Sequence, residues 1–258
     1  MTFEFDGKRY ENASTHQKEW GSSIISEFNL SGNEKILDLG CGNGALTAKL
    51  AELVPNGSVL GIDASQGMLD AVKGKKLSNL KFELMDINEL HLSEKFDLVF
   101  SNATLHWIKD HDNLWNSINN ILANNAIVRF NFAANGNCYN FFKVIQEAIT
   151  LNEYKEFFSE FIWPWYMPSI EEYKTIANKF HFSEIKIWEE NKDRYFPDKN
   201  AIVGWINQPS IVPFLKHLPE DKKESFREHV IKNVFEITAQ NDGTYFETFR
   251  RINVFVKK

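Results

Sequence analysis

The stretch "ILDLGCGNGALTAKLAELVPNGSVLGID", from Ile36 to Asp63, decides the fold class of this chain. An apolar run of strand type leads into three glycines at alternate positions, a segment with helically spaced leucines follows, and a second apolar run ends on a carboxylate. Glycines at such a junction let the chain turn sharply, let the backbone approach a ligand, and begin a helix whose free amides point toward that ligand. The stretch therefore predicts a strand, a nucleotide-binding loop, a helix and a second strand.

The glycines alone leave the nucleotide open. Gly40, Gly42 and Ala45 also satisfy the looser dinucleotide fingerprint G-x-G-x-x-G/A, whereas no Gly-Lys-Ser/Thr follows to make a phosphate-cradling P-loop. Asp63 ends the second strand, where a carboxylate can accept hydrogen bonds from both ribose hydroxyls of either kind of ligand. Together these residues predict an adenosine-type ligand. The alternative is a tight turn followed by a surface aspartate.

Two further aspartates bear on the choice of ligand. Asp38 lies inside the first apolar strand, where a buried carboxylate needs a partner. It would repel a pyrophosphate, and it would favour a ligand that carries an ammonium and a sulfonium. Asp86 follows the third expected strand, with Ile87 next to it. Asp86 could accept from an adenine amine, or it could cap a short helix, and both interpretations stay open.

Working outward from this stretch, apolar strand-type runs alternate with helical segments as far as Phe132. This alternation predicts an α/β fold with a largely parallel sheet and helices on both faces. The expected strands are residues 35–39, 58–63, 80–85, 96–101 and 126–132, then 184–190 and a last strand within 245–258.

The plain interpretation is one α/β domain over residues 1–258. Residues 1–30 precede the first strand and contain a helical stretch from about Ser14 to Phe28. Residues 133–182 break the alternation, and we expect a helical insertion there, after the fifth strand. Helices are also expected at about 199–216 and 220–239.

Composition excludes several other classes. The chain has 258 residues, of which 43% are hydrophobic, and none of its apolar runs approaches the length of ~20 residues that a membrane span needs. The charged start argues against a signal peptide, and two cysteines cannot supply a structural metal site, so we expect a cytoplasmic protein without a metal. The net charge of −6 without a large basic cluster disfavours nucleic acid. We expect a small-molecule partner and a monomer or weak homodimer.

Motifs further along the chain carry a specific resemblance. "LDLGCGNG" (37–44), "GIDAS" (61–65), "MDI" (85–87) and "SNATLHW" (101–107) occur in an order and spacing that resemble class I S-adenosylmethionine-dependent methyltransferases. The resemblance implies a Rossmann-like seven-stranded sheet whose last strand is antiparallel. The loop that begins "SNATLHWIKDH", the tail from Ile187 and the N-terminal "YENASTHQKEWG" narrow it to the trans-aconitate methyltransferase group and its neighbours. The resemblance is weakest across 133–182, the expected acceptor-side cap.

The resemblance implies S-adenosyl-L-methionine as the cofactor. Asp38 and Gly40 would meet its methionine end, Asp63 the ribose, and two residues of the N-terminal lid, residues 1–30, would close over it. The residues expected to bind the cofactor are Tyr10, Gln17, Asp38, Gly40, Gly42, Asp63, Ala64, Met68, Asp86, Ile87, Asn102 and Leu105. Of these, Ala64, Met68, Asp86 and Ile87 would surround the adenine, and Asn102 and Leu105 would lie near the sulfonium.

The sequence indicates the methyl acceptor less directly than it indicates the cofactor. A carboxylate acceptor is already ionised at neutral pH, so it needs positive groups to position it and no general base. His106 and Arg129 are the candidates for positioning it, with Arg194, Arg250 and Arg251 as further cations. His106 could instead act as base toward a hydroxyl or amine, or be a loop contact, and Arg129 could be an edge charge.

The leading hypothesis is an O-methyltransferase for a small carboxylic acid of trans-aconitate type. The alternatives are a methyltransferase for another small-molecule O or N acceptor and a non-catalytic nucleotide-binding module. An NAD-dependent oxidoreductase is a weaker alternative, motivated by the second glycine match.

Overall fold

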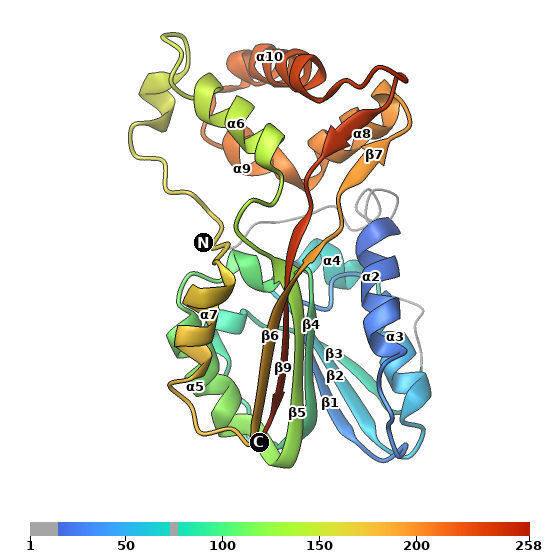
Figure 1. The fold of residues 1–258 in the computed structure, drawn as a ribbon. Coiled ribbons are helices and arrows are strands. Elements are labelled where there is room, and N and C mark those ends of the chain that lie inside the picture. Colours follow the sequence, from blue (N-terminus) through green and yellow to red (C-terminus); the bar gives the residue numbers. More distant parts are fainter. Residues whose placement is uncertain (1–14, 73–76) are drawn as a thin grey trace. The chain divides into compact units, whose positions relative to one another are not determined.

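The computed structural model describes residues 15–72 and 77–258, without the side chains of residues 15–17, 208 and 209 (Figure 1). Within these residues the chain forms two compact units. Unit 1 contains the chain up to Ala134, Trp165–Glu190 and Arg251–Lys258, and unit 2 contains Asn135–Pro164 and Asn191–Arg250. Each unit is described separately below.

Unit 1 is built on a seven-stranded sheet with the order β3-β2-β1-β4-β5-β9-β6. Neighbouring strands among β1 to β5 pair in parallel: β1 with β2 and β4, β2 with β3, and β4 with β5. Strand β9 runs antiparallel to β5, with Ala133 opposite Arg251. This confirms the expected sheet and its antiparallel last strand. The strands are β1 (Lys35–Leu39), β2 (Ser58–Asp63), β3 (Leu80–Leu84), β4 (Phe96–Asn102), β5 (Leu122–Ala133), β6 (Glu184–Asn191) and β9 (Arg250–Lys257).

The strand order makes the carboxyl end of β1 a natural ligand site. β2 and β4 flank β1 on opposite sides, so the connections that leave β1 and β4 diverge at this point. In open α/β sheets, ligands bind in the crevice outside such a switch point. The glycine loop that follows β1 lies there.

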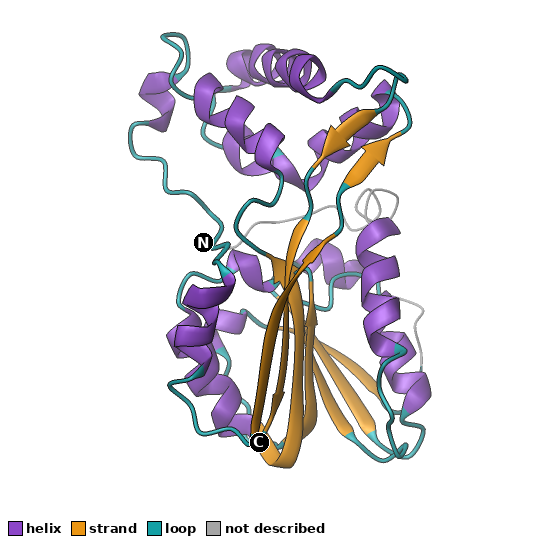
Figure 2. Ribbon diagram, in the orientation of Figure 1, coloured by secondary structure: helices purple, strands orange, loops and turns teal. Residues whose placement is uncertain are grey.

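Helices cover both faces of this sheet, as Figure 2 shows. Leu37 and Leu39 pack on the face that carries α5 (His111–Ile121) and α7 (Ile170–Ala177). Ile36 packs on the opposite face with α2 (Thr15–Ile25) and α3 (Ala45–Leu53). Because side chains alternate along a strand, Asp38 shares the α3 face with Ile36. The other elements of unit 1 are α4 (Gln66–Asp70), η1 (Ile87–Glu89) and η2 (Leu105–Trp107).

Unit 2 is mainly helical around an aromatic core, with a two-stranded antiparallel sheet. Trp205 contacts the rings of Phe141, Phe196 and Phe249 at centroid distances of 5.5, 5.5 and 5.7 Å. The elements are α6 (Tyr139–Ala148), η3 (Lys155–Phe158), β7 (Arg194–Phe196), α8 (Lys199–Trp205), a π-helical turn η4 (Ile206–Ser210), α9 (Val212–Leu215), α10 (Glu220–Thr238) and β8 (Tyr245–Glu247).

Several strand ends differ from the expected ones by one to four residues, and three differences are larger. The segment expected as one last strand divides into β8, which pairs with β7, and β9, which joins the main sheet. The helix expected over 199–216 is divided into α8, η4 and α9, with Pro213 in the first turn of α9 because proline cannot continue a helix. After β5 the chain enters unit 2, yet α7 belongs to unit 1 and α10 to unit 2, so unit 2 differs from the expected insertion 133–182.

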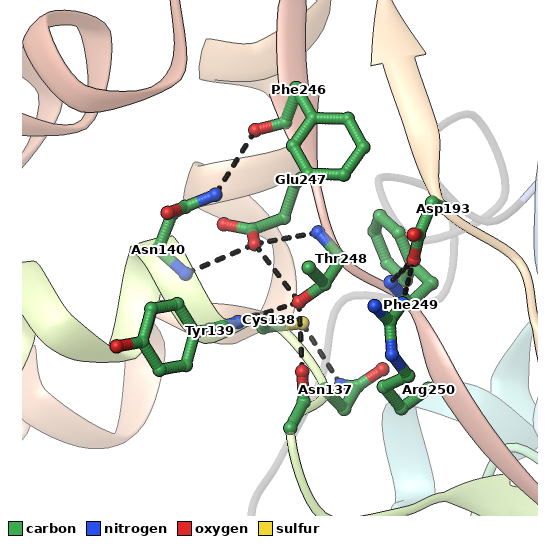
Figure 3. A network of polar contacts seen from close by, with 11 residues as sticks. Asn137, Cys138, Tyr139, Asn140, Asp193, Phe246, Glu247, Thr248, Phe249 and Arg250 are labelled. Atoms are coloured by element: carbon green, nitrogen blue, oxygen red, sulfur yellow. Dashed lines mark hydrogen bonds and ion pairs between the residues drawn. The ribbon is translucent and has the colours of Figure 1, made fainter.

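A buried carboxylate explains why the last strand divides (Figure 3). Glu247, at the end of β8, accepts hydrogen bonds from the amides of Asn140 and Phe141 in the first turn of α6 and from the amide of Thr248. The hydroxyl of Thr248 accepts from the amide of Tyr139. The first residue before α6 offers no side-chain cap, so this pair supplies the missing acceptors from a distant part of the chain.

Candidate functional site

The glycine loop has the backbone that its sequence predicts. Gly40, Gly42 and Gly44 have φ angles of 72°, 55° and 71°, a region that favours glycine. A Cβ at Gly40 would lie 2.1 Å from Thr104, and a Cβ at Gly44 would lie 2.5 Å from Phe82. A Cβ at Gly42 would meet none of the described atoms within 4 Å. Two glycines are therefore needed for packing, and Gly42 borders open space.

The Asp63 carboxylate ties the glycine loop to the end of β2. Oδ2 accepts from the amide of Gly42 at 2.8 Å, and Oδ1 accepts from the amide of Ser65 at 2.9 Å. Ser65 in turn caps α4 by accepting from the amide of Met68. Met68 is buried and Ala64 is exposed at the same strand end. The structure thus brings together all the residues expected here from the second motif.

Asp38 is buried beneath the loop, with 2% of its surface exposed. Its Oδ2 accepts from the hydroxyl of Thr47 on α3 at 2.7 Å. Burial raises the pKa of Asp38 to about 7, the Thr47 hydrogen bond opposes this, and the negative charge of Asp63 adds to it. A carboxyl group with this pKa changes charge readily near neutral pH when a cation approaches.

Asn43 is a polar residue of the loop that the sequence analysis missed. It is buried between Gly42 and Gly44, and its Oδ1 accepts from the amide of Ala45 at 3.3 Å. Its Nδ2 has no hydrogen-bond partner among the described residues. Buried donors are normally paired, so this amide is a candidate for a ligand contact. A polar side chain between two glycines of the turn was the available signal.

Asp86 adopts the helix-capping arrangement. Its Oδ1 accepts from the backbone and side-chain amides of Asn88, at 2.9 and 2.8 Å, at the beginning of η1. Ile87 is buried in the core on the α5 face of the sheet. A contact of Asp86 with an adenine amine stays a prediction.

The loop after β4 is fastened to the glycine loop. The hydroxyl of Ser101 donates to the carbonyl of Leu39, and the hydroxyl of Thr104 donates to the carbonyl of Gly40. Asn102 ends β4 at this edge, whereas the side chain of Leu105 is fully buried in the core. The two connections that diverge at the switch point are therefore held together by two side-chain hydrogen bonds.

His106 is a neutral imidazole at physiological pH. Part of its side chain is accessible, but Nδ1 is buried and has no hydrogen-bond partner among the described residues. Burial, followed by the charges of Arg251 and His111, lowers the pKa of His106 to about 3. The backbone carbonyl of His106 accepts from the amide of Tyr166 at 2.8 Å. A ring with so low a pKa is a weak base.

Arg129 and Arg251, both in the described part of unit 1, are held differently. Arg129 donates to the carbonyl of Phe130 and to Asn253, pairs with Glu27 at 3.2 Å, and lies over the ring of Trp188. These contacts hold the Arg129 side chain against residues of β5, β6 and β9 and against Glu27.

Arg251 lies at the beginning of β9, opposite Ala133, at the same edge as the loops after β1 and β4. It donates three hydrogen bonds to Asn131, at 2.6 to 3.1 Å, and lies over the ring of Trp20 at 4.9 Å. Arg250 is paired with Asp193 in unit 2.

The remaining candidates fall in different places. Trp165 contacts the ring of Trp107 at 5.1 Å in unit 1, whereas Trp163 packs on Phe142 at 5.1 Å in unit 2. Arg194 lies over the ring of Phe196 in unit 2. Tyr10 and the side chain of Gln17 lie outside the described residues.

In residues 15–72 and 77–258, His, Cys, Asp and Glu side chains do not gather in threes as a metal site requires. In the same part of the chain, the helices lack the length and apolarity of a membrane span.

The sequence of this chain is similar to those of known methyltransferases. A sequence profile described as a methyltransferase domain matches residues 30–180. A trans-aconitate 2-methyltransferase of Deinococcus radiodurans is 49% identical over 80 residues, 31% of this chain and 30% of that protein, so the match spans under a third of the relative. A trans-aconitate 2-methyltransferase of Yersinia pseudotuberculosis is 23% identical over 257 residues and 96% of both chains.

Among solved structures, phosphoethanolamine N-methyltransferase 2 of Haemonchus contortus, in complex with phosphomonomethylethanolamine and S-adenosylhomocysteine, superposes with a TM-score of 0.61 at 22% identity. The match covers 97% of this chain and 57% of that one. A likeness at this identity shows the shared fold.

Proposed function

The chain belongs to the methyltransferase-domain family and is an S-adenosylmethionine-dependent methyltransferase; we propose that its acceptor is a small carboxylic acid of trans-aconitate type. Two relatives that carry the name trans-aconitate 2-methyltransferase support this acceptor class, one over a short stretch and one over nearly the whole chain. The observation that carries the proposal is that the glycine loop with Asp38 and Asp63 lies at the same edge of the sheet as Arg251 at the beginning of β9.

The residues at the switch point fit the cofactor. Open space borders Gly42, the buried Nδ2 of Asn43 offers a donor for a carboxylate, and the carboxyl of Asp38 can meet an ammonium. We propose that Asp38, Gly40 and Gly42 hold the methionine end and that Asp63 holds the ribose. When bound, the cofactor supplies an electrophilic methyl group on a sulfonium.

The same placement at the strand ends suggests which residues contact the adenine and the sulfonium of the cofactor. We propose that Ala64 and Met68, with Asp86 and Ile87, surround the adenine at the ends of β2 and β3. Asn102 and the backbone near Leu105 are proposed to lie near the sulfonium, because they follow β4 beside the glycine loop.

The N-terminal lid also stays a proposal. Ile24 and Ile25 of α2 are buried in the core of unit 1, so this part of residues 1–30 is integral to the fold. A closing segment with Tyr10 would lie before α2, outside the described residues.

Arg251 is the better-placed cation for an acid acceptor. It lies at the edge that carries the proposed cofactor site, and its charge lowers the pKa of His106. Arg129 lies four residues before the end of β5 and binds Glu27 and Asn253. An ionised carboxylate needs no base, which agrees with the weakly basic His106. We propose that Arg251 positions the acceptor and that Arg129 stabilises the sheet.

The proposal is tested in two steps. Calorimetry with S-adenosylhomocysteine first asks whether the cofactor binds. Labelled methyl transfer to a panel of di- and tricarboxylic acids, phenols and amines then asks for the acceptor, with mass identification of the product. A methyl ester of a polycarboxylic acid is expected. Methylation of amines or phenols alone would overturn the acid acceptor, and binding without transfer to any acceptor would favour a non-catalytic module.

A further inference from the structure

Asp38 and Thr47 form a buried pair that joins β1 to α3. The Thr47 hydroxyl donates to Oδ2 of Asp38 at 2.7 Å, and the side chain of Thr47 is fully buried. The pair lies directly under the glycine loop, since Asp38 is two residues before Gly40 and α3 begins after Gly44. The hydroxyl therefore holds one oxygen of the carboxyl group against α3.

The surroundings of Asp38 leave it without a fixed counter-charge. β2 presents Gly61 and, at its end, the carboxylate of Asp63, and β4 presents Phe100. The thiol of Cys41, whose pKa is raised by burial and by both aspartates, remains neutral. Among the described residues, the groups that face Asp38 are therefore neutral or negative, and these surroundings favour the protonated carboxyl.

We propose that Thr47 is a positioning residue that orients the Asp38 carboxyl toward the ammonium group of the cofactor, a proposal that rests on the proposed cofactor site. Binding of the cofactor then releases one proton from the Asp38–Thr47 pair. The balance is simple: the carboxyl O–H bond of Asp38 breaks, the proton passes to solvent, and the carboxylate retains the Thr47 hydrogen bond and gains the ammonium. No other co-reactant is needed.

The proposal makes binding depend on pH in a defined direction. Burial raises the pKa of free Asp38 to about 7, so the group carries a proton below this pH. A nearby cation lowers a carboxyl pKa by about 1–3 units, so binding in mildly acidic solution must release the proton. The Kd should then increase as pH falls below about 7, by up to tenfold per pH unit, because binding and deprotonation are linked.

Calorimetry with S-adenosylhomocysteine near pH 6, in two buffers of different ionisation enthalpy, measures the protons released. We expect about half a proton to one proton for the wild type, since burial gives the free group a pKa of about 7 and a nearby cation lowers it by about 1–3 units. Asp38→Asn should release none and should bind with a Kd that does not vary between about pH 5.5 and pH 7.5.

Variants of Thr47 separate positioning from packing. Thr47→Val removes the donor at nearly constant volume, so the Asp38 pKa should increase and the pH at which Kd begins to increase should move upward by about one unit. Thr47→Ser keeps the hydroxyl and should keep the wild-type profile. The carboxyl ¹³C shift of Asp38 in the ligand-free protein gives the same comparison without any ligand.

The outcomes are distinct. Absence of binding to wild type would overturn the proposed cofactor site itself. Binding with no proton release, or a Thr47→Val profile equal to that of wild type in a folded variant, would overturn the role of the Asp38–Thr47 pair and leave the proposed function intact.

Discussion

The amide of Gly42 donates to Oδ2 of Asp63 across 2.8 Å, so the carboxylate that ends β2 also holds the loop that follows β1. Oδ1 accepts from the amide of Ser65, so both oxygens already bind backbone donors. A ribose bound here would share this carboxylate with the loop. Asp63 is therefore expected to act both in shaping the loop and in binding the cofactor.

Replacing Asp63 by alanine tests both roles. Two charge-assisted hydrogen bonds, each worth about 1.5–3 kcal/mol, would be lost, so the Kd for S-adenosylhomocysteine should increase by about a hundredfold or more. Asp97→Ala is a matched control, because Asp97 also accepts from a backbone amide, that of Lys35 at 2.9 Å, at the beginning of β1. Calorimetry that shows equal affinity for both variants would remove Asp63 from the cofactor site.

Gly42→Ala probes the open space above the loop. A Cβ at Gly42 meets no described atom within 4 Å, and the same holds at Gly243 in unit 2, where φ is 87°. Both substitutions should lower the unfolding free energy by about 1–2 kcal/mol, because alanine is strained at positive φ. Gly42→Ala should additionally weaken cofactor binding about tenfold or more by occupying ligand space. Equal affinities of the two variants would contradict a ligand at Gly42.

The buried Asp38 carboxyl should affect stability as well as binding. Burial raises its pKa from 3.8 to about 7, so between these pH values the folded protein holds a proton that the unfolded chain releases. The free energy of unfolding therefore falls as pH rises through this window. Asp38→Asn lacks this decline, so relative to wild type it should gain about 3 kcal/mol between about pH 4.5 and pH 8. Urea unfolding at both pH values measures the change, and a constant difference would contradict it.

Arg251 and Arg250 provide a paired test of the acceptor. Arg251→Lys keeps the charge but loses the planar fork that binds Asn131 at 2.6 to 3.1 Å. The KM for a carboxylic acid acceptor should increase about tenfold while the Kd for S-adenosylhomocysteine stays within about twofold. Arg250→Lys, whose partner is Asp193, is the control and should leave KM unchanged. An unchanged KM in both variants would exclude Arg251 from the acceptor site.

Glu247 is expected to stabilise unit 2. Glu247→Gln replaces an oxygen by a donor that would face the backbone amide of Asn140, as drawn in Figure 3, or that of Phe141, at the beginning of α6. The unfolding free energy should fall by about 1–3 kcal/mol. Hydrogen exchange at these two amides should accelerate. The exposed Glu156→Gln serves as control, and equal exchange in both variants would reject the capping role.

Local pattern predicted the parts of the fold whose signal lies within one segment. β1 and β2 have the expected bounds, and the three glycines have positive φ, because strand alternation and turn conformation depend on near neighbours. The same reasoning placed the candidate site at one edge of the sheet, because residues at the carboxyl ends of parallel strands meet there. The roles of its residues stay predictions. Asn43 was missed because its burial and its unpaired amide are visible only in three dimensions.

The sequence pattern could not predict contacts between segments that are distant in the chain. Unit 2 draws on 135–164 and 191–250, and the segment expected as one last strand divides where Glu247 and Thr248 cap α6. Arg250 and Arg251 are adjacent in the sequence, and only the structure shows that Arg251 binds Asn131 and Arg250 binds Asp193.

The sequence by itself determined the α/β sheet and the glycine loop, because these follow from periodicity and from steric demands on a few adjacent residues. It indicated the family through the resemblance of its ordered motifs, and the profile match to residues 30–180 shows that family. The tertiary structure decided the state of the side chains. Burial in the folded chain, aided by the charge of Asp63 and opposed by the Thr47 hydrogen bond, raises the pKa of Asp38 to about 7. Burial, followed by the charges of Arg251 and His111, lowers the pKa of His106 to about 3. Charge and hydrogen bonding depend on desolvation and on partners from other segments, which only the folded chain brings together.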